Sequence, residues 1–319
     1  MDQPLLSVLI SVYNHERYIE ECLRSIAAQK TTFDFEVLVG EDCSPDNSRQ
    51  ILKDLEPSLP DNFTILYREH NMGAVKNGED LYARARGKYL VDFEGDDYML
   101  YDHKFQEQVD FLEAHPEYSA IFTNVLVVDE NSQPLKEGYP QCAKEDYSYR
   151  ENFYSFLPGQ SGTSVCRRQD YFDARDNFMA LKTYDFYPGD RRNAFMFLTM
   201  GKVRCVQENW SAYRHVVKGG SSYSATLKKD QKFARNEVEF GRTLVAYAKK
   251  YGDQEAQDWA NLNFYRFRLR HCFSSAKIEP FSAIWKDAQK EKHSAALICS
   301  YLRWGIVLVS RLLRGQTIV

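Results

Sequence analysis

The sequence predicts an α/β protein built on a doubly wound, mainly parallel sheet. Through about the first 125 residues, short apolar runs alternate with segments whose apolar residues recur at helical spacing. Acidic or polar residues follow the apolar runs. Alternating strands and helices favour a parallel sheet that helices cover on both faces. Ligands bind beyond the carboxyl ends of such strands.

The apolar runs predict four buried strands, because each is continuous, short and bounded by polar turns. The predicted strands span residues 5–12, 35–40, 63–68 and 88–93. Amphipathic helices are expected between them, at 16–29, from Ser48 onward, and after the loop 69–73 through Arg86.

The later segments predict a mixture of strands and helices. A helix is expected at 102–114, strands at 120–128, 162–167 and 202–206, and a helix at 195–200. Residues 129–160 are polar, rich in tyrosine and irregular, and residues 225–292 are charged and helical in pattern.

Composition excludes several classes of protein. A net charge of −4 over 319 residues argues against a broad basic surface, so no nucleic-acid partner is expected. The seven cysteines are scattered and never paired as CxxC, which argues against a disulfide framework and a structural zinc site. With no secretory signal and no clean membrane span, a cytoplasmic location is expected.

Glu94, Asp96 and Asp97 come directly after the fourth predicted strand. Carboxylates fixed at a strand end can hold Mg²⁺ or Mn²⁺ against a diphosphate, since these ions prefer oxygen ligands. The alternative, with about even weight for the fragment alone, is a solvated acidic turn.

Other polar residues have a possible chemical role and a plainer structural one. Asp42 follows the second strand and can bind a base or ribose, or cap a helix, and Tyr13 can stack or pack. Asp190 can act as a general base or as a helix cap. Arg214 suits phosphate and His215 suits a metal, or both lie in a surface loop.

Together these segments resemble the family 2 glycosyltransferases with a GT-A fold. The likeness is highly specific over about the first 125 residues and extends more weakly to about residue 223. It rests on the ordered segments 7–14 with 18–19, 36–48, 71–73 with 76–77, 85–89, 94–98, and 108–113 with Pro116, which include SVLISVYN, EVLVGEDCSPDNS and EGDDY.

The resemblance implies roles for the donor site. Ser11, Tyr13 and Asp42 correspond to the pocket for the base of a nucleoside diphosphate, usually uridine, and Lys76 to a neighbour of the nucleotide. The Glu94–Asp97 run is similar to the family's DxD motif, which implies donor and metal contacts.

In the DxD-like run, Asp96 is expected near ribose and metal, and Asp97 toward metal and diphosphate. Asp190 corresponds to the catalytic base of an inverting displacement. Arg214 is expected at the donor and His215 at the metal, Mn²⁺ or Mg²⁺. Three positions depart from the family pattern. Glu94 is the first acidic residue of the DxD-like run, and Gly189 precedes Asp190 where the family often has Glu. The family's C-terminal motif often reads Tyr-Arg-x-His, whereas His215 directly follows Arg214 here.

The resemblance also predicts an organisation and an activity. Residues 1–223 are expected to form the GT-A catalytic domain, with a nucleotide-binding half (1–125) and an acceptor half (126–223). A helical region (224–319) follows. The expected reaction moves sugar from a UDP-sugar to a glycan or polyprenyl-linked acceptor of surface polysaccharide. A non-catalytic nucleotide-sugar-binding or scaffold protein is the alternative. A nucleotidyltransferase would carry a glycine-rich phosphate loop, which Ser11 to Arg17 lacks.

The segment 295–314 predicts an amphipathic tail helix, because Arg303 and Arg311 interrupt its apolar run. A basic face opposite an apolar one suits the inner face of the plasma membrane, near a lipid-linked acceptor. Packing on the catalytic domain or in a homodimer is the equally weighted alternative.

Overall fold

The computed structural model describes residues 3–135, 144–150, 158–215, 230–273 and 277–313, without the side chains of Trp304 and residues 306–313. The chain divides into two compact units, Met1–Asp173 with Met200–Gly220, and Ala174–Thr199 with Ser221–Val319. Residues 174–199, predicted as part of the acceptor half, therefore group with the C-terminal helices.

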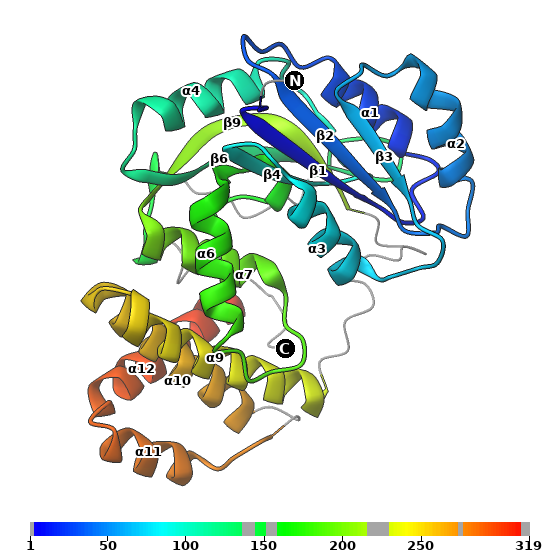
Figure 1. Ribbon diagram of the computed structural model, residues 1–319. Coiled ribbons are helices and arrows are strands. Elements are labelled where there is room, and N and C mark those ends of the chain that lie inside the picture. The colour runs from blue at the N-terminus through cyan, green and yellow to red at the C-terminus, as the bar shows by residue number, and fades with distance from the viewer. Residues whose placement is uncertain (1–2, 136–143, 151–157, 216–229, 274–276, 314–319) are drawn as a thin grey trace. The chain divides into compact units, whose positions relative to one another are not determined.

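The first unit is built on a sheet that is nine-stranded in the described residues (Figure 1). The strand order is β3-β2-β1-β4-β8-β6-β9-β5, and β7 pairs with β9. Strands β1 to β4 run parallel, whereas β8 is antiparallel to β4 and β6. The strands are β1 Leu6–Val12, β2 Phe35–Glu41, β3 Phe63–Tyr67, β4 Tyr89–Glu94, β5 Tyr98–Met99, β6 Tyr118–Val128, β7 Asp146–Tyr147, β8 Val165–Arg167 and β9 Lys202–Arg214.

Helices cover both faces of this sheet, because successive strand residues point to opposite sides and both sides are apolar. On one face, alternate residues of β1, β2 and β4 form a continuous core with α1, α2 and α4. On the other face α3 packs against β1 and β2. These helices are α1 Ile19–Ala27, α2 Ser48–Leu55, α3 Ala74–Arg84 and α4 Lys104–Ala114. Two 3₁₀ turns are also present, η1 Glu56–Ser58 and η2 Ser161–Thr163.

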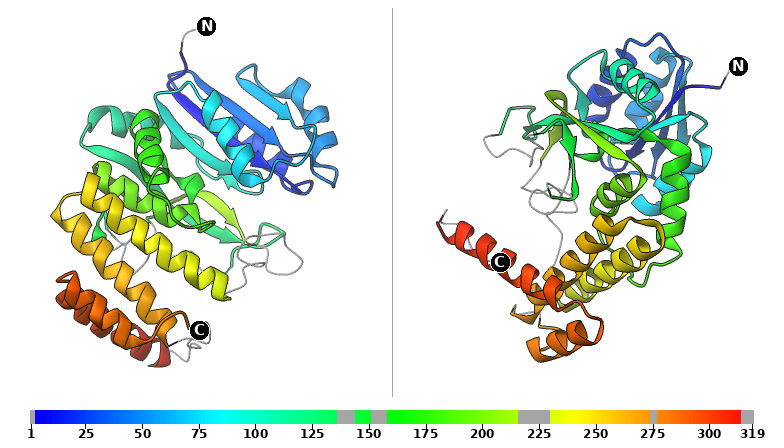
Figure 2. Two further views of the ribbon diagram at one scale, coloured as in Figure 1. Left: turned by 60° about the horizontal axis from the view of Figure 1, so that its bottom comes forward. Right: turned by 90° about the vertical axis from the view of Figure 1, so that its left-hand side faces the viewer.

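The second unit is helical in its described residues. Helix α6 (Arg168–Met179) leads into it, and α7 (Gly189–Met200), α9 (Gln231–Tyr251), α10 (Gln254–Cys272), α11 (Phe281–Lys290) and α12 (Ser294–Leu313) belong to it. Helices α9 and α10 lie side by side (Figure 2). Asp230 and Asp253 cap them, accepting hydrogen bonds from the amides of Phe233 and Ala256.

The predicted strands and helices of the first 125 residues are present, with ends shifted by a few residues. Strand β9 is longer than the predicted 202–206, and α6 and the two-residue strands β5 and β7 were not predicted. The GT-A fold prediction is tested below against solved structures. No helix in the described residues is long and apolar enough to cross a membrane. The tail forms α12, but most of its predicted faces lie outside the described side chains.

Two glycines give a matched test of this packing. A Cβ at Gly87 would lie 2.5 Å from the backbone nitrogen of Ser7, whereas a Cβ at Gly78, inside α3, would meet nothing within 4 Å. We expect Gly87→Ala to lower the free energy of unfolding by about 1–3 kcal/mol through overpacking. Gly78→Ala should raise it by roughly 0.5–1 kcal/mol through helix propensity. Urea unfolding measures both, and equal effects of the same sign would contradict this packing.

Candidate functional site

The parallel strands end level with one another at one edge of the sheet. Ser11 pairs with Gly40 on one side and with Glu94 on the other. The carbonyl of Ser11 accepts a hydrogen bond from Gly95 (3.1 Å), and the carbonyl of Val12 accepts one from Asp42 (2.9 Å). The residues that follow β1, β2 and β4 are therefore brought together, as the topology predicted.

Asp42 is a buried carboxylate that holds the loop before α3. One oxygen accepts from the amide of Met72 (2.7 Å) and the other from the amide of Gly73 (2.9 Å). Gly73 has φ = 81°, a left-handed backbone conformation that glycine adopts without strain. Asp42 does not cap α2, whose N-cap residue is Asn47. Its carboxylate fixes the shape of the edge beside Tyr13.

The other residues predicted to line the nucleotide pocket are Ser11, Tyr13 and Lys76, and all three are at least partly exposed. The side chain of Tyr13 is 41% exposed, so its ring face can take a planar ligand. Ser11 is half-buried at the end of β1, and Lys76 lies exposed on α3. The edge thus combines an aromatic face, a hydroxyl and a buried carboxylate.

Asp96 and Asp97, adjacent in the turn between β4 and β5, have opposite environments. Asp97 is buried; its two carboxylate oxygens accept from the amide of Arg214 and from the Gln160 side chain, each at 2.9 Å. Burial, then Asp96 and Glu94, raise the pKa of Asp97 well above its usual value. Asp96 is half-buried, and its Oδ1 has no hydrogen-bond partner in the described part of the chain.

His15 lies beside Asp96 and was not singled out from the sequence. Its Nε2 is 4.0 Å from Oδ1 of Asp96, and its buried Nδ1 lacks a hydrogen-bond partner among the described residues. Burial lowers the pKa of His15, against the attraction of Asp96 and Asp46. Gln160, which anchors Asp97, was also missed. No local sequence signal marks either residue, because their partners are distant in the chain.

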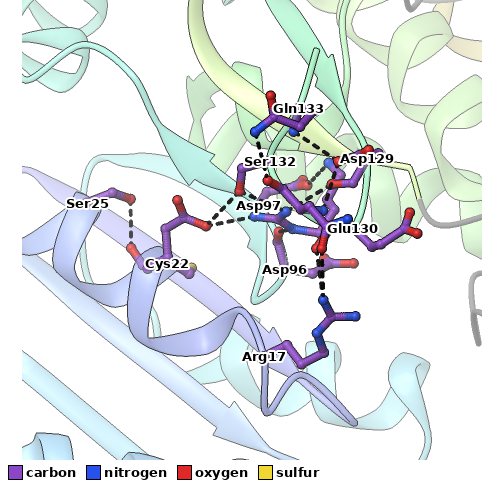
Figure 3. A network of polar contacts seen from close by, with 12 residues as sticks. Arg17, Cys22, Ser25, Asp96, Asp97, Asp129, Glu130, Ser132 and Gln133 are labelled. Carbon is purple, nitrogen blue, oxygen red and sulfur yellow. Dashed lines mark hydrogen bonds and ion pairs between the residues drawn. The ribbon is translucent and has the colours of Figure 1, made fainter. Parts of the chain in front are cut away.

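Arg214 lies buried at the end of β9. Figure 3 shows the network of polar contacts that includes Asp96, Asp97, Asp129 and Ser132. Its guanidinium donates to the carbonyls of Asp96 and Asp129, each at 3.0 Å, and to the Glu21 carboxylate at 2.7 Å. The guanidinium carbon lies 4.3 Å from the ring centroid of Tyr18. These contacts give Arg214 a structural role at the site, and its predicted role in donor binding stays a prediction.

The expected metal ligands are not assembled as a cluster. The described residues contain no group of three or more His, Cys, Asp or Glu side chains placed to hold a metal ion. His215 follows β9, where its amide donates to Val128 (2.8 Å) and its ring stacks on Tyr213. The metal roles of His215 and Asp97 therefore stay predictions, and Asp96 has the carboxylate oxygen best placed for a ligand.

Asp190 belongs to the second unit, at the second residue of α7. The residue is exposed. The protein around it nevertheless raises the pKa of its carboxyl above the usual value by desolvation, which Arg192 and Arg191 partly offset. A carboxylate at this position is a stronger base than an ordinary surface aspartate.

The model of the family described as "Glycosyl transferase family 2" matches residues 7–182, which include the whole edge described above. The chain belongs to glycosyl transferase family 2. An uncharacterized protein of Mycobacterium tuberculosis, Rv1520, is 34% identical over 184 residues, covering 56% of this chain and 52% of its own. An uncharacterized glycosyltransferase of Methanocaldococcus jannaschii, MJ1057, is 30% identical over 241 residues, covering 73% and 78%.

Solved structures show the GT-A fold. Residues 1–349 of TarS from S. aureus, in complex with UDP-GlcNAc, superpose with a TM-score of 0.62 at 18% sequence identity. The match covers 92% of this family 2 chain and 79% of that one. The predicted fold class is therefore confirmed. This chain spans about half the length of the first curated relatives that it matches.

Arg214→Gln tests the structural role of this arginine. We expect the free energy of unfolding to fall by about 3 kcal/mol, because a buried network loses a charged member. Arg24→Gln, at an exposed i,i+4 pair with Glu20, should change it by about 0.5 kcal/mol or less. Chemical denaturation measures both. An Arg214→Gln chain of full stability that has lost UDP binding would instead place Arg214 at the donor.

Proposed function

We propose that the chain is an inverting glycosyltransferase that moves a sugar from a UDP-sugar to a hydroxyl group. The acceptor is a glycan or a polyprenyl-linked molecule of surface polysaccharide biosynthesis. The observation that carries this proposal is the sheet edge, where Asp96, Asp42 and Tyr13 follow strands that end level. Family membership and the GT-A fold support it.

The edge suits a nucleoside diphosphate. Tyr13 offers a ring face on which a base can stack, and the lone pairs that Asp42 keeps can accept from a base N–H. Ser11 and Lys76 supply a hydroxyl and a cation for the ribose and phosphates. UDP is the donor nucleotide that the sequence resemblance favours. The TarS complex with UDP-GlcNAc, on the same fold, agrees with it.

A divalent cation, Mn²⁺ or Mg²⁺, fits one side of this edge. The buried Oδ1 of Asp96 lacks a partner in the described residues, and buried polar atoms are normally satisfied. One or two carboxylates plus substrate phosphates suffice for such an ion, so Asp96 is the proposed ligand. When bound, the cation neutralises charge on the diphosphate leaving group. Asp97, buried through both oxygens, holds the turn that presents Asp96.

Asp190 is the proposed general base. Its carboxylate takes the proton of the acceptor hydroxyl as the oxygen attacks the anomeric carbon, which inverts the configuration. The raised pKa suits this task, because a base works best when its pKa lies near the working pH. A non-catalytic nucleotide-sugar-binding or scaffold protein is the alternative, and the presence of Asp42, Asp96 and Asp190 argues against it.

We also propose a cytoplasmic location with contact to the inner face of the plasma membrane, where polyprenyl-linked acceptors lie. Large apolar side chains at the end of α10 and on α11 and α12 support a contact surface: Phe273, Phe281, Ile298, Tyr301 and Leu302 are all more than a third exposed. Exposed aromatic and aliphatic residues beside lysines are typical of interfacial helices. The alternative is that a second copy of this chain covers the surface, in a homodimer formed through α12.

Asp96→Asn tests the donor edge. We expect UDP binding in the presence of Mn²⁺ to be lost, because an amide is a poor ligand for a hard cation. Thermal stability should change little, since the Oδ1 of Asp96 accepts no hydrogen bond from the described residues and has only His15 near it, at 4.0 Å. Isothermal calorimetry measures UDP affinity, and the exposed Asp61→Asn is the matched control. Unchanged UDP affinity in Asp96→Asn would count against the assignment.

Asp190→Asn separates chemistry from donor binding. Transfer should fall by roughly 10²–10⁴, the range for loss of a general base, while UDP affinity is unchanged. Asp185→Asn, exposed in the same unit, should leave transfer intact. Transfer assays with a panel of UDP-sugars and glycan or lipid-linked acceptors measure the effect. A fully active Asp190→Asn removes Asp190 from the mechanism.

The pH dependence of kcat/KM for transfer tests the role of Asp190 independently. The base acts in its deprotonated form, so kcat/KM should fall as the pH decreases through the pKa of Asp190. Because that pKa is raised, the acidic limb should lie above the 3.8 of an ordinary aspartate. An acidic limb at or below this value, with Asp190 still essential, would contradict the raised pKa.

A further inference from the structure

His15 lies in the loop between β1 and α1, and hydrogen bonds fix its backbone on both sides. Its amide donates to the hydroxyl of Ser48 (2.8 Å). Its carbonyl accepts from the amides of Tyr18 (2.9 Å) and Ile19 (3.0 Å), where α1 begins. The residue before it, Asn14, has φ = 65°, a left-handed conformation that is uncommon outside glycine. The direction in which the His15 side chain leaves the backbone is therefore set by the fold.

The imidazole ring of His15 packs against Gly95, in the turn that carries Asp96. A Cβ at position 95 would lie 2.8 Å from Nδ1 of His15, which is closer than such atoms approach one another in proteins. The ring thus occupies the space that a side chain at position 95 would need. Nδ1 lies on the glycine side, and the other nitrogen, Nε2, approaches the Asp96 carboxylate, 4.0 Å from its Oδ1.

The separation of Nε2 and Oδ1 is too long for a hydrogen bond, which needs about 3.2 Å or less. Oδ1 of Asp96 is nonetheless buried and accepts no hydrogen bond from the described residues. Buried polar atoms normally have a partner. The side chains of His15 and Asp96 are 18% and 23% exposed, so a small ligand can reach the pair. A group that fits between Nε2 and Oδ1 would contact both atoms at once.

A divalent cation matches this gap. Bonds from such ions to imidazole nitrogen or carboxylate oxygen are about 2.0–2.2 Å long, so two ligands that lie nearly opposite on one ion are about 4 Å apart. Asp97 is not available for this role without losing its contacts, because both of its oxygens accept from the protein. The described residues offer no cluster of three or more ligands. The diphosphate of the donor and water would complete the coordination.

A nitrogen ligand changes which cation the site prefers. Mg²⁺ takes oxygen ligands and gives up its waters reluctantly, whereas imidazole suits first-row transition metals. Of the two cations considered for the donor edge, Mn²⁺ is the transition metal. A site with one imidazole and one carboxylate is therefore expected to bind Mn²⁺ more tightly than Mg²⁺.

We propose that His15 and Asp96 together bind the divalent cation of the donor site, through Nε2 and Oδ1, and that the imidazole makes the site select Mn²⁺ over Mg²⁺. The proposal rests on the proposed function, because it takes the cation and UDP at this edge. It assigns the imidazole ligand to the loop after β1, where the sequence resemblance predicts His215 instead. One short loop then supplies both a ring for the base, Tyr13, and a ligand for the cation.

Pulsed electron paramagnetic resonance detects a histidine ligand of Mn²⁺ directly, through the hyperfine coupling of its nitrogen. The sample is the full chain without a histidine tag, with Mn²⁺ and saturating UDP, in a buffer free of nitrogen ligands. We expect the wild type to show a nitrogen coupling, which changes to the ¹⁵N pattern when the chain is labelled with ¹⁵N-histidine. A histidine that only donates a hydrogen bond to Asp96 would not give the coupling of a directly bound nitrogen. This measurement needs no variant, so misfolding cannot obscure it.

His15→Gln and His215→Gln separate the two candidate histidines. The nitrogen coupling should be absent from His15→Gln and retained by His215→Gln and by His103→Gln, an exposed control. In His15→Gln the affinity of the UDP complex for Mn²⁺ should fall roughly tenfold or more. Its affinity for Mg²⁺ should change less than about threefold, because glutamine puts an oxygen donor in place of the nitrogen. His15→Phe, which keeps a ring against Gly95, should also lose the coupling and is the second variant if His15→Gln is less stable.

Three results would overturn the proposal: a wild-type complex with Mn²⁺ and UDP that shows no nitrogen coupling, a coupling that survives in His15→Gln, or one that is lost in His215→Gln. Equal losses of Mn²⁺ and Mg²⁺ affinity in His15→Gln would overturn the selectivity. The proposed function is tested separately. If UDP binds with Mn²⁺ in the wild type and not in Asp96→Asn, the donor edge stands whatever the nitrogen coupling shows. A wild type that does not bind UDP with Mn²⁺ would contradict the proposed function, and this proposal with it.

Discussion

The buried contact between Asp97 and the backbone of Arg214 is the constraint on which the sheet edge depends. It joins the turn after β4 to the end of β9, positions 117 residues apart in the chain. Burial disfavours the charged form of Asp97, so this carboxylate stabilises the turn only while its hydrogen bonds remain intact. The Arg214 side chain then binds the same turn, α1 and the loop at Asp129. With the backbone of Asp96 held by Arg214, its carboxylate remains available to a ligand.

The sequence was sufficient to predict the first strands and helices, because their signals are local. Short apolar runs specify β1, β2 and β4, and the topology of parallel strands places the residues after them at one edge. The length of β9 was not predictable, since its second half is polar in sequence and is held by pairing with β5 and β6. Helix α6 was missed because its charged residues obscure any apolar stripe.

The separate roles of neighbouring site residues could not be predicted from the sequence to the same extent. Asp96 and Asp97 are chemically identical, and only contacts with Gln160 and Arg214, far along the chain, show that both oxygens of Asp97 are engaged by the protein. Asp190 is a related case. The family likeness led to a predicted domain boundary at residue 223. In the structure, however, residues 174–199 group with the helices that follow that boundary. The scaffold of the proposed base is thus helical, and Tyr187 and Arg191, close to Asp190 in the chain, both donate hydrogen bonds to Glu237 of α9.

The hydrogen bonds from Met72 and Gly73 to Asp42 tie this carboxylate to the shape of the loop before α3. A buried carboxylate that holds two amides, one on each oxygen, cannot be exchanged for a neutral residue without loosening the loop, because at least one amide would lose its acceptor. Conversely, a residue other than glycine at position 73 would strain the left-handed backbone that brings those amides to Asp42. On the proposed role of Asp42 in binding the base, a change of base preference would therefore require coordinated substitutions in two separate segments of the chain.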